Sequence, residues 1–431
     1  MPNYYSSQIR DERITRSVDW TTVSLYAVLV IFGWLNIHAS IYDPDTHNGL
    51  LDFSTNSGKQ FIWICTSFVL LSIILIIDHR FYDSFAWYIY GGIFLSLISV
   101  LIFGKEVKGS KSWFEIGGLA LQPSEFAKLG VSLALAKYIS EPTVKMDRLK
   151  DQLIAGSIII APALLILLQN DTGSFLVFSA FLVVFYREGM SPFIIILGAA
   201  CVTILVLTIV FPQIYLMIAF GIIGICSIYF LKRKTIQNVM MTLGLTVATI
   251  AYTGTVDYFF NQVLQPHQQR RLRVLVDPDN PDYALNIGWQ VTQAKIAIGS
   301  GGFLGKGYLE GTQTKFDFVP DQSTDNIFCT VGEEHGWVGS FVLICLFIAM
   351  FLRLLFIADR QKTKFARVFG YCVASILFFH FTVNIGMTIG IFPVIGIPLP
   401  FFSYGGSSLW AFTVMLFLFL NLDASRRLIL G

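Results

Sequence analysis

Long apolar stretches recur along the chain from residue 20 onward, separated by mostly short polar connections. A helix needs roughly 17–25 mostly apolar residues to cross the hydrocarbon core of a bilayer. By this measure the pattern predicts about 10–12 membrane-spanning helices. The segments are 20–42, 60–77, 84–104, 122–140, 152–169, 173–187, 192–211, 214–231, 236–254, 337–357, 366–387 and 408–424.

This pattern also restricts the fold class. In lipid every backbone polar group needs an internal partner, so only helices and closed barrels span a membrane. A barrel would show repeated segments of alternating polarity, and no such pattern is evident in the sequence. We therefore expect an all-α, polytopic membrane helix bundle, organised as a single membrane domain over residues 1–431.

Composition supports lipid as the solvent of this chain. Hydrophobic residues make up 55% of the sequence and charged residues 13%, about half the 25% of a typical soluble domain. No basic face or arm indicates nucleic-acid binding. The six cysteines occur singly, which favours neither disulfides nor zinc. Nineteen mostly polar residues precede the first apolar stretch, so we expect no cleavable signal peptide.

Lysine and arginine are concentrated in alternate connections, which assigns these connections to the cytoplasm. Both chain ends, including segment 1–19, are then expected inside. Two outward connections, 105–111 and 270–273, are nevertheless basic. Long loops escape the rule, which explains the second, whereas a function for outward cations would explain both. The inward residues are Arg10, Arg13, Arg16, Arg80, Lys145, Arg148, Lys150, Arg187, Lys232, Arg233, Lys234, Arg360, Lys362, Lys364, Arg367, Arg426 and Arg427.

Segment 255–336 is the one large outward loop and is rich in Gly, Gln, Asp and Pro. A structureless loop of that length is uncommon unless it is functional. Residues 283–299 predict a short amphipathic helix that ends at Gly299. The glycine-rich run 299–307 then needs positive φ angles or a close approach to other backbone. Its spacing does not match a phosphate-binding P-loop, so we exclude nucleotide binding.

Several polar residues lie in or next to the predicted spans, where they are costly and by default functional. Glu125 and Lys128 are three residues apart on one helix face, either as a mutually neutralising anchor or as the wall of a polar cavity. Asp171 precedes Thr172 and is either a helix cap or a functional carboxylate. For His380 and Asn384, hydrogen bonding between helices is a sufficient explanation.

Four acidic residues, Asp321, Asp325, Glu333 and Glu334, gather before the predicted span 337–357. They could solvate the loop or favour a helix start. Alternatively, one carboxylate could act as general base for a sugar hydroxyl. Cations in the same loop would suit a pyrophosphate-linked lipid as substrate, and the residue chemistry alone leaves both interpretations open. These cations are Arg270, Arg271, Lys295 and Lys306.

Long motifs in order along the chain resemble the SEDS family (shape, elongation, division and sporulation). GTQ at 311–313 and IPLPF at 397–401 are more similar to its RodA branch than to its FtsW branch. The motifs that carry the resemblance are KGSKSWFEIGGLALQPSEFAK (108–128), QND (169–171), QQRRLRVLVDPDNPDYALNIGWQVTQAKIAIGSGGFLGKGYLEGTQ (268–313), VPDQSTDNIFCTVGEEHGWVG (319–339) and NIGMTIGIFPVIGIPLPFFSYGGSS (384–408).

The resemblance implies a GT-C-like peptidoglycan glycosyltransferase of the bacterial inner membrane that serves cell elongation and shape. Such enzymes polymerise lipid II through β-1,4 bonds outside the membrane and release undecaprenyl pyrophosphate. The family's catalytic aspartate falls on Asp325, which would deprotonate the acceptor 4-hydroxyl. Arg271 and Lys295 would face the pyrophosphate. Further residues expected to bind substrate are Lys108, Trp113, Glu125, Lys128, Asp171, Gln293 and Lys306.

The resemblance further suggests a class B penicillin-binding protein, a transpeptidase, as partner. It makes a divalent metal, Mg²⁺ or Mn²⁺, a candidate cofactor, although no ligand spacing in the sequence indicates one. A lipid II flippase, a scaffold and an FtsW-like division polymerase remain alternatives. The chain departs from the family pattern at Asn326, where a Phe is usual, at Ser112, where an Arg is usual, and at Ala294, where a Ser is frequent. Segment 214–254 is an additional apolar pair beyond the family's ten spans.

Overall fold

The computed structural model describes residues 18–42, 49–107, 109–116, 119–231, 235–263, 266–274, 288–316 and 318–426. The chain forms two compact units. The first comprises Met1–Met190 with Gln293–Gly431, and the second comprises Ser191–Thr292.

The first unit is a bundle of long helices. Its short helices α7 (Thr172–Val177) and α8 (Phe181–Arg187) are joined by the 3-10 turn Phe178–Ala180 into one apolar stretch. Its described helices are α2 (Trp20–Ile41), α3 (Asn56–Ile76), α4 (His79–Phe103), α5 (Pro123–Ser140), α6 (Leu149–Leu168), α7 (Thr172–Val177), α8 (Phe181–Arg187), α15 (Thr312–Lys315), α16 (Ile327–Asp359), α17 (Lys364–Thr388) and α18 (Gly406–Ser425).

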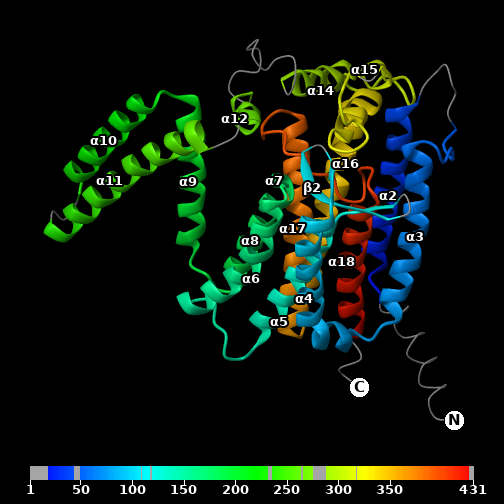
Figure 1. Cartoon of the computed structure of the whole chain (residues 1–431), viewed down its shortest axis with the longest axis horizontal. Coiled ribbons are helices and arrows are strands. Elements are labelled where there is room, and N and C mark those ends of the chain that lie inside the picture. Colours follow the sequence, from blue (N-terminus) through cyan, green and yellow to red (C-terminus); the bar gives the residue numbers. More distant parts are fainter. Residues whose placement is uncertain are drawn as a thin grey trace. The chain divides into compact units, whose positions relative to one another are not determined.

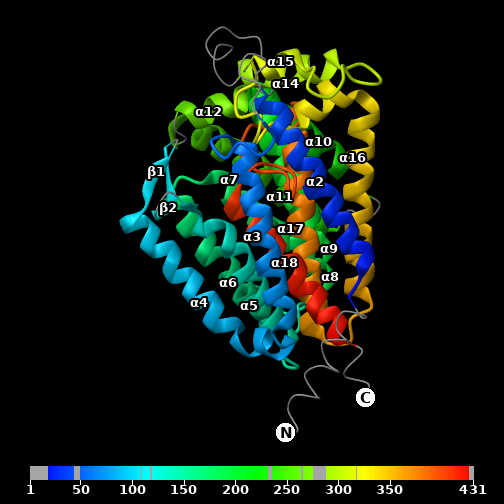
Figure 2. The ribbon, with the colours of Figure 1, turned by 90° about the vertical axis from the view of Figure 1, so that its right-hand side faces the viewer.

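Helices α5, α17 and α18 form the centre of this bundle, and the other long helices surround them (Figure 2). Most of α17 and α18 is buried, whereas only 22% of the apolar window of α3 and 17% of that of α4 are covered. The uncovered faces carry large apolar side chains such as Phe68, Tyr88 and Phe103. Lipid is the solvent that such faces require.

The described residues contain nine helices long and apolar enough to cross a membrane, and two shorter apolar stretches, Thr172–Arg187 and Gln213–Tyr229. Helix α5 is also of spanning length but carries Glu125, Lys128 and Lys137. These segments coincide with the predicted spans. The prediction of an all-α, multi-pass membrane protein is confirmed.

The second unit contains α9 (Pro192–Val210), α10 (Gln213–Tyr229), α11 (Ile236–Tyr258), a π-helical turn (Phe259–Val263) and α12 (Pro266–Arg273). Helices α10 and α11 pack side by side as a hairpin (Figure 1). A Cβ atom added at Gly224 would lie 2.9 Å from Thr246 Cβ, so glycine permits this close approach. The additional apolar pair at 214–254 is therefore a helical hairpin.

A small antiparallel sheet, absent from the sequence-based expectation, joins α4 to α5. Strands β1 (Lys105–Val107), β2 (Ser110–Ile116) and β3 (Leu119–Leu121) lie in the order β1-β2-β3. Gly109 has φ 82°, the positive φ that a tight hairpin turn demands. The sheet is attached to the bundle where Ser110 Oγ and Lys111 N donate to Gln169 O, at 2.9 and 3.0 Å. We refer to this end of the first unit as the sheet end.

The glycine-rich run has the conformations predicted for it. Gly302, Gly305 and Gly307 have φ angles of 58°, 85° and 116°, and a Cβ atom at Gly301 would collide with Gly332 O. The run follows α14 (Trp289–Ser300), which ends one residue beyond the predicted Gly299. The beginning of that predicted helix, 283–287, lies outside the described residues.

Helix α16 is broken at Gly336, which has φ 63° and ψ −156°. The break leaves backbone groups without their helical partners, and the glycine-rich run supplies replacements. Lys306 N and Gly307 N donate to Glu333 O and Glu334 O, both at 3.0 Å. In the opposite direction, Trp337 N and Val338 N donate to Gly302 O and Phe303 O at 2.9 and 3.1 Å. Because unpaired backbone groups are costly when buried, this exchange stabilises the break.

A substitution of Gly305 tests this interlock. In Gly305→Ala the positive φ is strained and the new Cβ collides with Glu334 O, so we expect a loss of about 2 kcal/mol or more of folding stability. Thermal unfolding of the detergent-solubilised protein measures it. Gly299→Ala is the matched control, because no atom lies within 4 Å of its added Cβ. Equal melting temperatures for the two variants would contradict the interlock.

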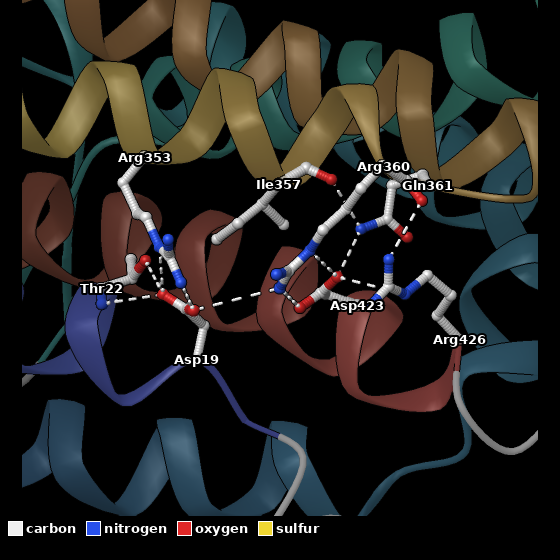
Figure 3. A network of polar contacts seen from close by, with 8 residues as sticks. All are labelled: Asp19, Thr22, Arg353, Ile357, Arg360, Gln361, Asp423 and Arg426. Atoms are coloured by element: carbon white, nitrogen blue, oxygen red, sulfur yellow. Dashed lines mark hydrogen bonds and ion pairs between the residues drawn. The ribbon is translucent and has the colours of Figure 1, made fainter.

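Ion pairs fasten the opposite end of the first unit, which we call the Asp19 end (Figure 3). Asp19 caps α2 by accepting from Thr22 N at 3.0 Å, and it forms a two-pronged pair with Arg353 of α16. Arg360 forms a second two-pronged pair with Asp423 near the end of α18. The start of α2 and the end of α18 are therefore held at the same end of the bundle, as expected if both chain ends lie on one side.

The pKa of Asp19 gives this network a testable pH dependence. Burial tends to raise this pKa, but hydrogen bonds from Arg353 and Thr22 outweigh burial and lower it from 3.8 to about 2. A depressed carboxyl pKa stabilises the fold above the unfolded value of 3.8, and this contribution disappears as pH falls through about 2. We therefore expect Asp19→Asn to lower the melting temperature by a constant amount above about pH 4. The difference from the wild type should shrink below that pH, and a difference independent of pH would contradict the assignment.

Candidate active site

The intramembrane pair predicted from the sequence is an ion pair in the buried centre of the bundle. Lys128 Nζ lies 2.8 Å from Glu125 Oε2 and 3.0 Å from His380 Nε2 of α17. It also lies 4.8 Å from the centre of the Phe412 ring of α18. The ammonium group is fully buried and is surrounded by side chains from α5, α17 and α18. This arrangement matches the anchoring interpretation of the pair. A role in substrate binding stays a prediction.

The turn that precedes α16 is bound to helix α17 and to the loop between α17 and α18. Three successive carbonyl oxygens of this turn accept hydrogen bonds: Ser323 O from Tyr404 N at 2.9 Å, Thr324 O from Ser403 Oγ at 2.5 Å, and Asp325 O from Asn384 Nδ2 at 2.8 Å. We call residues 320–326 the Asp325 turn and residues 389–405 the α17–α18 loop.

Asn384 corrects the sequence-based expectation of hydrogen bonding between helices. Its Nδ2 donates to two carbonyls outside helices, Asp325 O and Ile397 O at 2.7 Å. For His380, one turn earlier, the expectation is confirmed, because its Nε2 hydrogen-bonds Lys128 of α5 at 3.0 Å. Its Nδ1 also lies 3.1 Å from Pro398 O in the loop. Loop carbonyls lack helical partners and therefore attract buried donors, which the i,i+4 spacing alone could not indicate.

Asp325 is half-buried at the sheet end. An added Cβ at Gly396, which has φ 70°, would lie 3.3 Å from Asp325 Oδ2, so the carboxylate lies against the backbone of the α17–α18 loop. Asn326 follows it as the N-cap position of α16. Its buried Nδ2 donates to Pro320 O at 2.8 Å and closes the turn. This contact accounts for the asparagine at a position where the resemblance leads one to expect Phe.

Asp171 caps α7, as one of the two sequence interpretations proposed. Its Oδ1 accepts from Ser174 N at 2.9 Å. Its Oδ2 accepts from Gln122 Nε2 at 3.0 Å and from Ser124 Oγ at 3.2 Å. Helix α7 also touches the α17–α18 loop, because a Cβ at Gly173 would lie 2.5 Å from Ile395 O. Asp171 and Asp325 thus flank the same loop.

Glu333 forms hydrogen bonds and an ion pair that the sequence did not indicate. Its buried carboxylate accepts from Lys306 Nζ at 2.6 Å and from Thr312 N, Gln313 N and Thr314 N at 2.8, 2.8 and 3.0 Å. It therefore caps the start of α15 and pairs with Lys306. Glu334 is buried as well, so neither glutamate solvates the loop. Substrate binding by Lys306 stays a prediction, and its ammonium already has a carboxylate partner.

Helix α14 presents Lys295 at its exposed face. Ala294 and Ala297 pack against Val319 and Cys329, which places small residues where α14 meets the segments around Asp325. This packing explains Ala294 at a position where the resemblance leads one to expect Ser. Lys295 is exposed, Gln293 is buried, and Trp113 is half-buried in β2.

Two of the predicted substrate-binding residues, Lys108 and Arg271, have side chains outside the described part of the chain. Helix α12, which carries Arg271, belongs to the second unit. The described residues contain no group of three or more His, Cys, Asp or Glu side chains arranged for a metal ion. Mg²⁺ commonly uses one or two carboxylates together with substrate phosphates, a donor set that the Asp325 carboxylate and a pyrophosphate would provide.

Together these features define a multi-pass membrane protein with a half-buried aspartate on a backbone-anchored turn at one end of its bundle. Residues 19–219 and 186–428 match the family described as "Cell cycle protein", which covers FtsW, RodA and SpoVE proteins. The chain belongs to this family.

Similar proteins support the RodA type within this family. The chain is 33% identical over 436 residues to peptidoglycan glycosyltransferase RodA of Treponema pallidum, covering 95% of this chain and 98% of that protein. It is 34% identical over 347 residues to peptidoglycan glycosyltransferase MrdB of Escherichia coli K12, covering 80% of each. One solved structure, described as "Structural coordination of polymerization and crosslinking by a peptidoglycan synthase complex", contains a chain with TM-score 0.70 and 26% identity. That match covers 95% of this chain and 98% of the other.

Two substitutions of Asp171 distinguish its role as the cap of α7 from a role of its negative charge in activity. Asp171→Ala removes the cap and two further hydrogen bonds, so we expect a loss of about 1–3 kcal/mol of folding stability. Asp171→Asn keeps a side-chain oxygen for Ser174 N, but its Nδ2 cannot accept from Gln122 Nε2. It should therefore be destabilised less than Asp171→Ala. Thermal unfolding distinguishes them, and equal destabilisation would contradict the capping role. The activity of the Asn variant then reports on the charge.

Proposed function

We propose that this chain polymerises lipid II at the outer face of the bacterial inner membrane, with Asp325 as general base. As a member of its family, with relatives named for this activity, the chain is a peptidoglycan glycosyltransferase of the RodA type. The proposal adds the substrate, the catalytic residue and the side of the membrane. Its biological role would be cell elongation and the maintenance of shape.

In the proposed reaction the Asp325 carboxylate removes the proton of the acceptor 4-hydroxyl. The oxygen attacks C1 of the donor sugar and forms the β-1,4 bond, while the bond from C1 to the pyrophosphate oxygen breaks. Undecaprenyl pyrophosphate leaves with the electron pair. The proton on Asp325 then passes to solvent, which restores the base.

The position of Asp325 carries the proposal. Of the four acidic residues before the membrane-spanning part of α16, Glu333 is occupied as a cap and Glu334 is buried. Asp321 is exposed to solvent. Asp325 is half-buried, and its turn is fixed by backbone hydrogen bonds. A partly desolvated carboxylate on a rigid support suits proton abstraction in a defined geometry.

Cations would stabilise the departing pyrophosphate. Lys295 is exposed on α14 and suits this role. The same role is proposed for Arg271 and Lys108 on the family resemblance alone. Lys306 would act more weakly, because it is paired with Glu333. A divalent ion, Mg²⁺ or Mn²⁺, would neutralise negative charge on the leaving pyrophosphate, and Asp325 is the residue that would help to hold it.

The proposed orientation has both chain ends in the cytoplasm. The distribution of Lys and Arg supports it, as does the junction of α2, α16 and α18 at the Asp19 end. The partner we propose is a class B penicillin-binding protein that cross-links the new strand. Support comes from the similar solved structure, whose description pairs polymerization with crosslinking in one complex.

Conversion of labelled lipid II tests the proposal, using purified protein with its partner and Mg²⁺ or Mn²⁺. Asp325→Asn should reduce the rate of polymer formation at least about 100-fold, because it removes the base. Asp321→Asn, in the same turn, is the control and should stay within about three-fold of the wild type. Persistent polymerisation by Asp325→Asn would overturn the catalytic assignment. No polymer from the wild type under any condition would favour a flippase or a scaffold.

A further inference from the structure

Helix α17 carries two buried side chains that donate hydrogen bonds to the Asp325 turn and to the α17–α18 loop. His380 and Asn384 are one helical turn apart, so they lie on the same face of α17. Their acceptors are Pro398 O, Ile397 O and Asp325 O, at 3.1, 2.7 and 2.8 Å. The two side chains are 1% and 0% exposed, so neither is a surface residue that meets solvent directly.

We propose that His380 and Asn384 are positioning residues that set the location of the Asp325 carboxylate. Asn384 joins the Asp325 turn to the α17–α18 loop, because one amide group donates to a carbonyl of each. His380 holds the neighbouring residue of the same loop. The proposal rests on the catalytic role of Asp325.

The ion pair in the bundle centre defines the hydrogen-bonding state of His380. The Lys128 ammonium group has donors and no acceptor, so His380 Nε2 must accept from it. The ring proton then lies on Nδ1, where it is donated to Pro398 O at 3.1 Å. Lys128 therefore orients the imidazole from one side, in the way that a second partner commonly defines a histidine tautomer.

The loop beside the carboxylate depends on these contacts. Gly396 has φ 70°, and Asp325 Oδ2 lies against it. Ile397 and Pro398 are the two residues that follow Gly396, and their carbonyl oxygens are the ones that Asn384 and His380 of α17 contact. A shift of this loop would move both the carboxylate's neighbour and, through Asn384, the backbone of Asp325. Misplacement of a catalytic group by about 1 Å can cost around 100-fold in rate.

A matched pair of asparagines tests the proposal. Asn384→Leu removes the donor to Asp325 O and Ile397 O. Asn421→Leu removes a similarly buried amide of α18, which donates to Ile74 O and Ile77 O at 2.6 and 2.9 Å near the Asp19 end. Both variants should lose stability. We expect only Asn384→Leu to lower kcat, by about 10–100-fold, with KM for lipid II within about three-fold.

Two variants of His380 keep the test decisive if Asn384→Leu does not fold. His380→Gln offers both an acceptor for Lys128 and a donor for Pro398 O, so its kcat should recover to within about five-fold of the wild type. His380→Phe offers neither and should lower kcat at least about 10-fold while KM stays nearly constant. A kcat unaffected in His380→Phe, or lowered equally in Asn384→Leu and Asn421→Leu, would overturn the positioning role.

Asp325→Asn, measured in the same assay, separates this proposal from the one on which it rests. If Asp325→Asn still polymerises lipid II, the catalytic assignment fails. If Asp325→Asn is inactive and the α17 variants retain kcat, only the positioning role fails.

Discussion

Backbone hydrogen bonding at interrupted helices is the constraint on which the sheet end depends. An unpaired N–H or C=O group is expensive in or near lipid, and this end contains two interruptions: the break of α16 at Gly336 and the loop that follows α17. In each case the missing partners come from a different structural element. The glycine-rich run supplies them for α16, and Asn384 with His380 supplies them for the loop. Satisfying these groups assembles the site.

Charged residues of the first unit are used mainly in pairs. Lys128 with Glu125, Lys306 with Glu333 and Arg360 with Asp423 each place a partly or fully buried carboxylate against a cation. Burial of such pairs is tolerable only when the geometry and the remaining hydrogen bonds are good. The Asp325 turn is held differently, because the contacts that anchor it go to carbonyl oxygens. Uncharged donors therefore hold the backbone of this turn in place.

The sequence predicted the features that follow from local pattern. Apolar length located the membrane helices, and the glycines of 299–307 indicated positive φ angles, because both depend on neighbouring residues alone. It did not predict the small sheet, whose short strands lack a clear alternation. Nor could it identify the acceptors of Asn384, since Asp325 is 59 residues away in sequence. Asn326 stood out as a departure, and its contact with Pro320 became interpretable only once the turn was seen.

The spacing of Glu125 and Lys128 has a consequence for the synthesis of this protein. During insertion into the bilayer, α5 enters long before α17 has been made, so His380 cannot yet contact the lysine. A lone ammonium group in a span raises the cost of insertion by about 3 kcal/mol. Glu125, one helical turn away, accompanies Lys128 into the membrane as its counter-charge. The order of the chain thus lets this helix cross the bilayer first and acquire its histidine partner afterwards.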